Sequence, residues 1–312
     1  MTFDLQGKKV WVAGHRGMLG SALVRRLSRE DCEILTVDRA QLDQRDGAAV
    51  LRWVQSTRPD AVIIASAKAG GIMAHRMQPV EFLLDNLQIG TAILAAAHAC
   101  DVDRAVFISS SAVYPAQTAM PIHESALLTG PFDPSHHGYA IAKIAGMALA
   151  QAYSRQYGRA YISALPTNLY GPGDKYDATT SHVVPAIIRK VHEASQIGEP
   201  VVVWGSGRPR RELLHVDDCA DACVHLLQHH AGDEHVNVGY GSDVSIIDLT
   251  LMVMETISYH GKILHDLDKP DGTMQKLMSS DRLRALGWIP RIDLRTGLAG
   301  TYADFLERFA LD

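Results

Sequence analysis

The sequence has few cysteines, no surplus of basic residues and no recognisable set of metal ligands. Its four cysteines show no Cys-x-x-Cys spacing and lie within apolar or helical patterns, as free thiols in a reducing compartment do: Cys32, Cys100, Cys219 and Cys223. None of the 15 histidines belongs to a set with convincing metal spacing. We therefore predict no metal site, and we interpret His136–His137 and His229–His230 as exposed loop residues.

The charge balance and the apolar pattern exclude two classes of partner. A formal net charge of -5 and a pI near 6.3 argue against nucleic acid or an anionic membrane as the main partner. No apolar run approaches the roughly 18 residues that span a bilayer, and the first residues lack the pattern of a signal peptide. We expect a soluble cytoplasmic protein without a membrane partner.

Apolar strand-like runs alternate with helical patterns through the first half of the chain. In 312 residues with 47% apolar content, this alternation predicts an α/β protein with a parallel, doubly wound Rossmann-type sheet. The composition changes after residue 172. We predict a cofactor-binding domain over 1–172, with a returning segment near 214–244, and a smaller C-terminal α/β substrate domain mainly over 173–312.

Three glycines follow the first predicted strand. Gly14, Gly17 and Gly20 have a G-x-x-G-x-x-G spacing, and a helical pattern begins at Met18 and Leu19. Glycine lets the backbone approach a pyrophosphate, whose charge suits the free N–H groups at a helix start. Because the loop joins a strand to a helix, dinucleotide binding is favoured over a merely tight turn.

The residues that would contact the adenosine ribose give conflicting signals. Asp38 ends the second predicted strand, where an acid can bond the ribose hydroxyls of NAD and would repel the 2′-phosphate of NADP. Arg39 and Arg16 can instead neutralise that phosphate. We predict NADP as the cofactor and keep NAD as an alternative.

Tyr139 and Lys143 lie one helical turn apart, on one face of a predicted helix. An adjacent cation favours the phenolate, so we expect Lys143 to lower the tyrosine pKa toward neutrality. Ser110 follows the fourth predicted strand, where its hydroxyl can bind a substrate oxygen. Taken singly, these residues also suit a half-buried aromatic, a lysine reaching to solvent and a helix-capping serine.

An arginine-rich turn follows a predicted strand in the last third of the chain. Arg208, Arg210 and Arg211 are three arginines in four residues of an acidic protein. We interpret them as a local anion site, and a solvated charged turn is the alternative.

Several motifs together resemble the GDP-L-fucose synthase family of extended short-chain dehydrogenases/reductases. The resemblance runs in order from about Lys8 to about Phe305. The segments that carry it are Ala13-Gly-His-Arg-Gly-Met-Leu-Gly20, Ala67-Lys-Ala-Gly-Gly-Ile72, Tyr139-Ala-Ile-Ala-Lys-Ile-Ala-Gly146, Pro166-Thr-Asn-Leu-Tyr-Gly-Pro172, Ser181-His-Val-Val-Pro185, Val203-Trp-Gly-Ser-Gly207, Leu214-His-Val-Asp-Asp218 and Lys269-Pro-Asp-Gly272.

This resemblance implies an NADPH-dependent enzyme that epimerises C3 and C5 of GDP-4-keto-6-deoxy-mannose and then reduces C4, commonly as a homodimer. It implies that Ser110, Tyr139 and Lys143 form the reductase triad and that His182 is an acid/base in epimerisation. The implied cofactor contacts also include Pro166, Asn168 and Leu169. The implied substrate contacts are Ser111, Lys190, Trp204, Arg211, Asp271 and Lys276.

The sequence departs from the family pattern at one position. The family has Ser-Ser-Cys-Ile-Tyr-Pro after the fourth strand, and its cysteine is the second epimerisation acid/base. Here the segment is Ser110-Ser-Ala-Val-Tyr-Pro115, and the methyl group of Ala112 cannot transfer a proton. We therefore expect a C4 reductase with weak or absent epimerase activity, unless Ser111, His123 or a water replaces the thiol.

Two rival functions remain open at this point. One is reduction of a related GDP-4-keto sugar to another product, such as a 6-deoxy-talose, rhamnose, colitose or heptose derivative. The other is a non-catalytic nucleotide sensor, which the intact Tyr139 and Lys143 disfavour.

Overall fold

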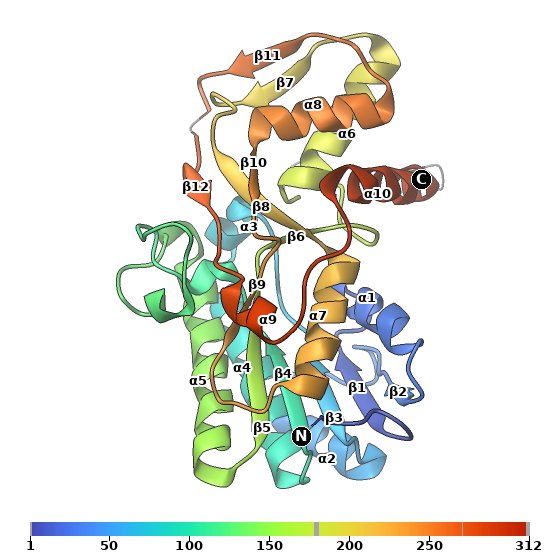
Figure 1. Cartoon of the computed structure of the whole chain (residues 1–312), viewed down its shortest axis with the longest axis vertical. Coiled ribbons are helices and arrows are strands. Elements are labelled where there is room, and N and C mark those ends of the chain that lie inside the picture. Colours follow the sequence, from blue (N-terminus) through green and yellow to red (C-terminus); the bar gives the residue numbers. More distant parts are fainter. Residues whose placement is uncertain (1, 178–180, 270, 310–312) are drawn as a thin grey trace.

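The computed structural model describes residues 2–177, 181–269 and 271–309. Its larger part is a parallel six-stranded sheet of order β2-β1-β3-β4-β5-β9 between two layers of helices (Figure 1). The predicted Rossmann-type fold is thereby confirmed. The strands of this sheet are β1 (Lys9–Ala13), β2 (Glu33–Leu35), β3 (Ala61–Ile64), β4 (Arg104–Ile108), β5 (Ala160–Pro166) and β9 (Val236–Val238).

Helices bury both faces of this sheet in two apolar cores. One core includes residues of α1 and α7, and the other includes residues of α2, α4 and α5. All four residues of β3 are buried apolar side chains, as expected for a parallel strand that is covered on both faces. These helices are α1 (Met18–Leu27), α2 (Gly47–Thr57), α4 (Pro79–Ala99), α5 (His137–Tyr157) and α7 (Val216–His229).

The smaller part of the molecule is built around β8, which pairs with β6, β10 and β12 (Figure 1). A two-stranded sheet of β7 and β11 and three helices complete it around a third apolar core. Its elements are β6 (Asn168–Tyr170), β7 (Val201–Trp204), β8 (Arg210–His215), β10 (Asp243–Ser245), β11 (Ile263–Asp266), β12 (Gln275–Lys276), α6 (Val183–Ile197), α8 (Ile246–Ile257) and α10 (Leu294–Phe309).

The chain passes between the two parts more than once. β8 leads directly into α7, which packs against α1, and β9 then becomes an edge strand of the large sheet. The division at residue 172 with a returning segment stays a prediction. Short helices complete the chain: α3 (Ile72–Met77), α9 (Asp281–Ala285), η1 (Ser111–Val113), η2 (Glu124–Ala126) and η3 (Pro134–His136).

Helix α4 corrects one expectation about apolar segments. It is the one helix among the described residues that is long and apolar enough to cross a membrane by length and composition alone. Glu81 and Asp85 interrupt its apolar pattern, so no uncharged run was visible in the sequence. In the fold this helix packs against α2 and α5 and buries Phe82, Ile93 and Leu94. A core helix of a globular protein can have the same length and apolar composition as a membrane-spanning helix.

Helix α5 approaches β4 closely because glycine replaces a side chain at the contact. A Cβ atom on Gly146 would lie 2.3 Å from Cζ of Phe107, and one on Gly90 of α4 would lie 3.1 Å from the same ring. Phe107 is buried between the two helices and has little room to move. This contact fixes the distance between α5 and β4, and with it the position of Tyr139 and Lys143 relative to the end of β4.

We predict that Gly146→Ala destabilises the protein by about 1–3 kcal/mol, because the added methyl overlaps the Phe107 ring. Alanine otherwise favours a helix over glycine by about 1 kcal/mol. Gly300→Ala in α10 is the matched control, since nothing lies within 4 Å of its Cβ position. Urea unfolding measures both variants. A Gly146→Ala protein as stable as the control would contradict the predicted overlap.

Candidate functional site

The turn between β1 and α1 contains three glycines. Close packing leaves no room for a side chain at Gly14 and Gly20, whereas Gly17 has room for one. A Cβ on Gly14, whose φ is +84°, would lie 2.7 Å from the backbone of Ser66, and one on Gly20 would lie 1.9 Å from the Gly14 carbonyl oxygen. A Cβ on Gly17 would come no closer than 3.4 Å to the Gly14 carbonyl oxygen. Gly17 precedes α1 without a side-chain cap, so its surface is open to a pyrophosphate.

Asp38 is already paired with the glycine-rich turn. Its carboxylate lies 2.7 Å from Nη2 of Arg16 and 3.2 Å from Nε2 of His15. Arg39, the next residue, is exposed. β2 ends at Leu35, three residues before Asp38, although the sequence predicted a strand through residue 38. The arrangement brings two arginines and one carboxylate to the place where a dinucleotide ribose would lie.

The structure brings the three predicted triad residues together at the end of β4. Ser110 caps the short helix η1 by accepting a hydrogen bond of 3.2 Å from the Ala112 amide, and its hydroxyl also bonds the Tyr139 hydroxyl. Lys143 is buried, and its Nζ donates a hydrogen bond of 2.8 Å to the Ile108 carbonyl. The capping alternative and the catalytic prediction for Ser110 are therefore compatible.

The pKa values of this group differ from the sequence-based expectation. Burial raises the pKa of Tyr139 to about 12, and only the hydrogen bond with Ser110 opposes the rise. Burial also lowers the pKa of Lys143 to about 8. The prediction that Lys143 lowers the tyrosine pKa is wrong here, because its ammonium bonds the Ile108 carbonyl and lies 5.8 Å from the centroid of the phenol ring. The phenol therefore keeps its proton at neutral pH.

A groove of about 440 Å³ opens beside the end of β5, and Asn168, Leu169 and His182 are among its lining residues. Asn168 and Leu169 belong to β6, directly after Pro166 and Thr167 at the end of β5. His182 immediately precedes α6 and is solvent-exposed. Two predicted cofactor residues and a predicted catalytic residue thus line the same groove.

The lining of the groove also includes an exposed aromatic ring with cations beside it. Trp204 is 57% exposed, with Nζ of Lys190 4.3 Å and Nζ of Lys269 5.8 Å from the centroid of its rings. A flat ring between cations suits a nucleobase. Asp271 also lines the groove, but its carboxylate accepts hydrogen bonds of 2.8 and 2.7 Å from the backbone and hydroxyl of Ser206.

Arg211 and Lys276 are paired positions of β8 and β12. Burial lowers the pKa of both side chains, to about 8 for Lys276, and the charge of Arg211 lowers the Lys276 pKa further. Asp133 opposes the shift at Lys276. Two desolvated cations side by side favour a bound anion. Arg210 instead pairs with Asp243 at 2.7 Å, so only part of the arginine-rich turn serves such a site.

Two histidines to which the sequence analysis gave no functional role belong to this region. His75 lies on α3, a helix that was not predicted, with its ring centroid 5.3 Å from that of Tyr139. His136 is partly buried beside it, with 6.2 Å between ring centroids. The interpretation of His136 as an exposed loop residue is therefore wrong. Ser111, a predicted substrate contact, is buried behind Ser110.

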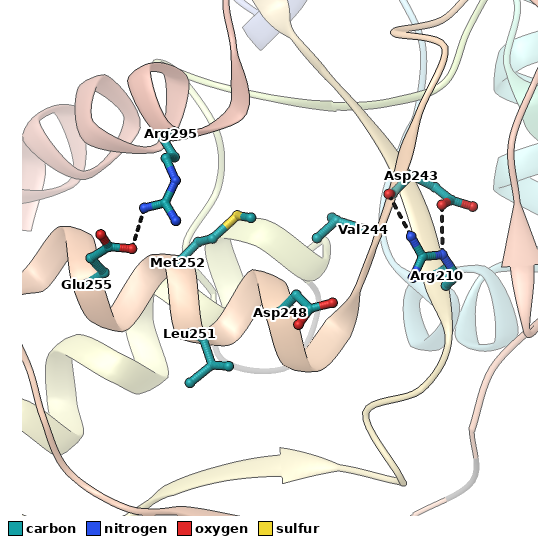
Figure 2. A pocket seen from close by; sticks show the side chains of 8 residues that line it. All are labelled: Arg210, Asp243, Val244, Asp248, Leu251, Met252, Glu255 and Arg295. Carbon is teal, nitrogen blue, oxygen red and sulfur yellow. Dashed lines mark hydrogen bonds and ion pairs between the residues drawn. The ribbon is translucent and has the colours of Figure 1, made fainter.

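Figure 2 shows a second hollow, of about 380 Å³, between α8, α10, β10 and the start of β8. Its charged groups satisfy one another: Arg210 bonds Asp243, Arg295 bonds Glu255, and Asp248 accepts from the Ser245 hydroxyl. We assign no ligand to it. Among the described residues there is also no group of three or more potential metal ligands.

Comparisons with known proteins agree with this geometry. The model of the NAD dependent epimerase/dehydratase family matches residues 10–239. A GDP-L-fucose synthase of Sinorhizobium fredii is 47% identical over 98% of this chain and 98% of its own. A Naegleria fowleri GDP-L-fucose synthetase bound to NADP has a TM-score of 0.89 at 26% identity, covering 99% of this chain and 97% of its own. A GDP-6-OMe-4-keto-L-xylo-heptose reductase from Campylobacter jejuni has a TM-score of 0.91 at 27% identity, covering 99% and 100%.

We predict that Lys276→Met stabilises the protein at pH 7 by about 1–3 kcal/mol, because it removes a partly buried cation beside Arg211. The folded pKa of about 8 lies below the ordinary 10.5. Between these values the folded chain has released a proton that the unfolded chain keeps, so wild-type stability rises with pH. The stability of Lys276→Met relative to the wild type should therefore be smaller at pH 10 than at pH 7.

Urea unfolding at pH 7 and pH 10 measures this difference. Lys262→Met is the control, since Lys262 is exposed. A Lys276→Met variant that is less stable than the wild type at pH 7 would contradict the prediction. It would show that interactions in the folded protein outweigh the desolvation cost of the Lys276 ammonium.

Proposed function

Because the chain belongs to the NAD dependent epimerase/dehydratase family, and within it to the GDP-L-fucose synthases, we propose that it reduces C4 of GDP-4-keto-6-deoxy-D-mannose with NADPH. One observation carries this proposal. The protonated Tyr139, bonded to Ser110 and one turn from the buried Lys143, lies near a groove with an aromatic and cationic wall.

The protein residues divide the work of ketone reduction. Ser110 orients the ketone oxygen by a hydrogen bond, and Tyr139 donates its proton to that oxygen as negative charge develops there. The high pKa of Tyr139 keeps the proton available for this direction of reaction. When bound, NADPH supplies the hydride for C4. Lys143, fixed by its bond to the Ile108 carbonyl, would hold the ribose of bound NADPH beside Tyr139.

The groove suits a nucleoside diphosphate sugar. Trp204, flanked by Lys190 and Lys269, offers a stacking surface for the base. Arg211 and Lys276 offer two desolvated cations for the diphosphate. These contacts would leave the sugar near His182 and the triad.

NADPH is the cofactor that we propose, with NADH as the alternative. The open surface of Gly17 at the start of α1 fits a dinucleotide pyrophosphate. Arg16 and Arg39 can both contact a 2′-phosphate, and Arg16 already lies against Asp38, which offsets the repulsion from that carboxylate. NADP is bound in the related Naegleria fowleri structure.

A C4 reductase without epimerase activity is a second candidate. Ala112 supports it, because the side chain at this position has no proton to exchange. Other GDP-4-keto sugars are further substrates to compare, since the Campylobacter jejuni relative is named for a GDP-heptose. Product stereochemistry, assigned by NMR, separates the two candidates: an L-galacto sugar contradicts the pure reductase.

We also propose that the protein is a cytoplasmic homodimer. The four cysteines are all free, which suits a reducing compartment. Helices α4 and α5 expose the apolar residues Val80, Leu84 and Ile141, which a second copy would cover. A monomeric mass by sedimentation at micromolar concentration would contradict the dimer.

We predict that Tyr139→Phe lowers kcat for NADPH oxidation by about 10²–10⁴-fold, because it removes the proton donor. The assay follows absorbance with GDP-4-keto-6-deoxy-D-mannose. Tyr157→Phe at the exposed end of α5 is the control and should keep wild-type turnover. Comparable rates for the two variants would exclude Tyr139 as the acid.

We predict that Arg39→Leu lowers kcat/KM for NADPH by about tenfold or more and changes kcat/KM for NADH by less than about twofold. A charge-assisted bond to the 2′-phosphate contributes about 1.5–3 kcal/mol, and NADH lacks that phosphate. Arg52→Leu on α2 is the control. An equal loss with both nucleotides would show that Arg39 does not distinguish NADPH from NADH. It would favour NADH as the cofactor, because Asp38 can bond its ribose hydroxyls.

A further inference from the structure

Two histidines from separate segments, His75 and His136, lie near the ring of Tyr139, and a third, His182, approaches His75 from the groove. His75 comes from α3, His136 ends η3, and His182 precedes α6. The ring centroid of His75 lies 5.3 Å from that of Tyr139 and 6.2 Å from that of His136. His182 is close enough to His75 for its charge to lower the His75 pKa. Reduction of the ketone uses none of these imidazoles.

His136 lies directly against the residue where a proton-transfer group is missing. A ring nitrogen of His136 is hydrogen-bonded to the backbone of Ala112, and its Nδ1 lies 3.1 Å from the Ser135 hydroxyl. The segment that carries it packs on both α3 and α5. The His136 side chain is thus held beside the triad by the packing of η3 on α3 and α5.

Charged groups of the site surround His136 as well. Burial lowers the pKa of His136 and so does the charge of Lys276 from the anion site, while Asp133 and the bond to Ala112 only partly oppose this shift. His75 approaches from α3. His75 itself is a poor proton carrier near neutral pH, because burial lowers its pKa to about 4. The pKa of both His75 and His136 is lowered, and of the two only His136 is hydrogen-bonded to the backbone of Ala112, so His136 is the one placed to act for the missing group.

Inversion at C3 or C5 needs two proton-transfer groups. A base removes the proton from one face of the carbon, and the electron pair of the C–H bond moves onto the adjacent ketone oxygen as an enolate. An acid then delivers a proton to the other face of the same carbon, and the ketone re-forms without net oxidation. His182, in the groove, can fill one role, but the methyl group of Ala112 cannot fill the other.

We propose that His136 is the second acid/base of epimerisation, acting with His182 in place of a side-chain group at position 112. The inference rests on the proposed GDP-sugar function and deepens it: the enzyme is an epimerase as well as a reductase. The proton-transfer group that η1 lacks at position 112 is supplied by His136 of η3, which is hydrogen-bonded to the backbone of Ala112.

Solvent exchange tests this role separately from reduction. The wild-type enzyme is incubated in D₂O with GDP-4-keto-6-deoxy-D-mannose and without NADPH, and NMR and mass spectrometry follow deuterium at C3 and C5. We expect incorporation at both carbons. His136→Asn should slow it by about 100-fold or more, and NADPH added afterwards should still be oxidised at a rate within about tenfold of wild type.

Two further variants make the result specific. His137→Gln changes the exposed neighbouring histidine and should exchange like the wild type. Ala112→Cys in the His136→Asn background places a thiol beside the vacated position and should restore exchange by about tenfold or more. Restoration by a thiol at position 112 is not expected if His136 only supports the fold.

The outcomes separate this inference from the proposed function. Wild-type enzyme that oxidises NADPH without incorporating deuterium overturns the inference and leaves a pure C4 reductase. Enzyme that does neither overturns the proposed function, and the inference with it. A His136→Asn variant that exchanges at the wild-type rate, or that loses exchange and NADPH oxidation together, also overturns the catalytic role of His136.

Discussion

The close contact between α5 and β4 positions the three groups that the proposed reduction uses, Ser110, Tyr139 and Lys143. Gly146 allows the helix to rest on the ring of Phe107, and one turn earlier Lys143 reaches the Ile108 carbonyl at the end of the strand. A buried ammonium is costly unless it is hydrogen-bonded, so this 2.8 Å bond both fixes the lysine and ties the helix to the strand end. Tyr139 then meets Ser110 one turn above.

Burial, rather than charge pairing, sets the protonation states at the site. It raises the pKa of Tyr139 and lowers those of Lys143, Arg211 and Lys276. A phenol that keeps its proton suits ketone reduction, and cations that have lost water suit a diphosphate. Such groups cost stability in the protein without ligand, which is the usual relation between stability and function at a binding site.

The histidine cluster shows how the site draws on segments outside the triad. His75, His136 and His182 come from α3, η3 and the residue before α6, which are far apart in the sequence and come close only in the folded protein. Whether Ala112 abolishes epimerisation therefore depends on the proton-transfer groups that surround it. A substitution that removes a proton carrier from one segment leaves the neighbouring segments free to provide another.

The sequence by itself determined the alternation of strands and helices, the glycine turn and the places of Ser110, Tyr139 and Lys143, because periodicity and turn residues act over a few positions. It failed on α3, on the exposure of His136 and on the direction of the Tyr139 pKa shift. Those properties depend on which distant segments pack together and exclude water. Only the tertiary structure decides that, since desolvation is a property of the assembled site and not of any local pattern.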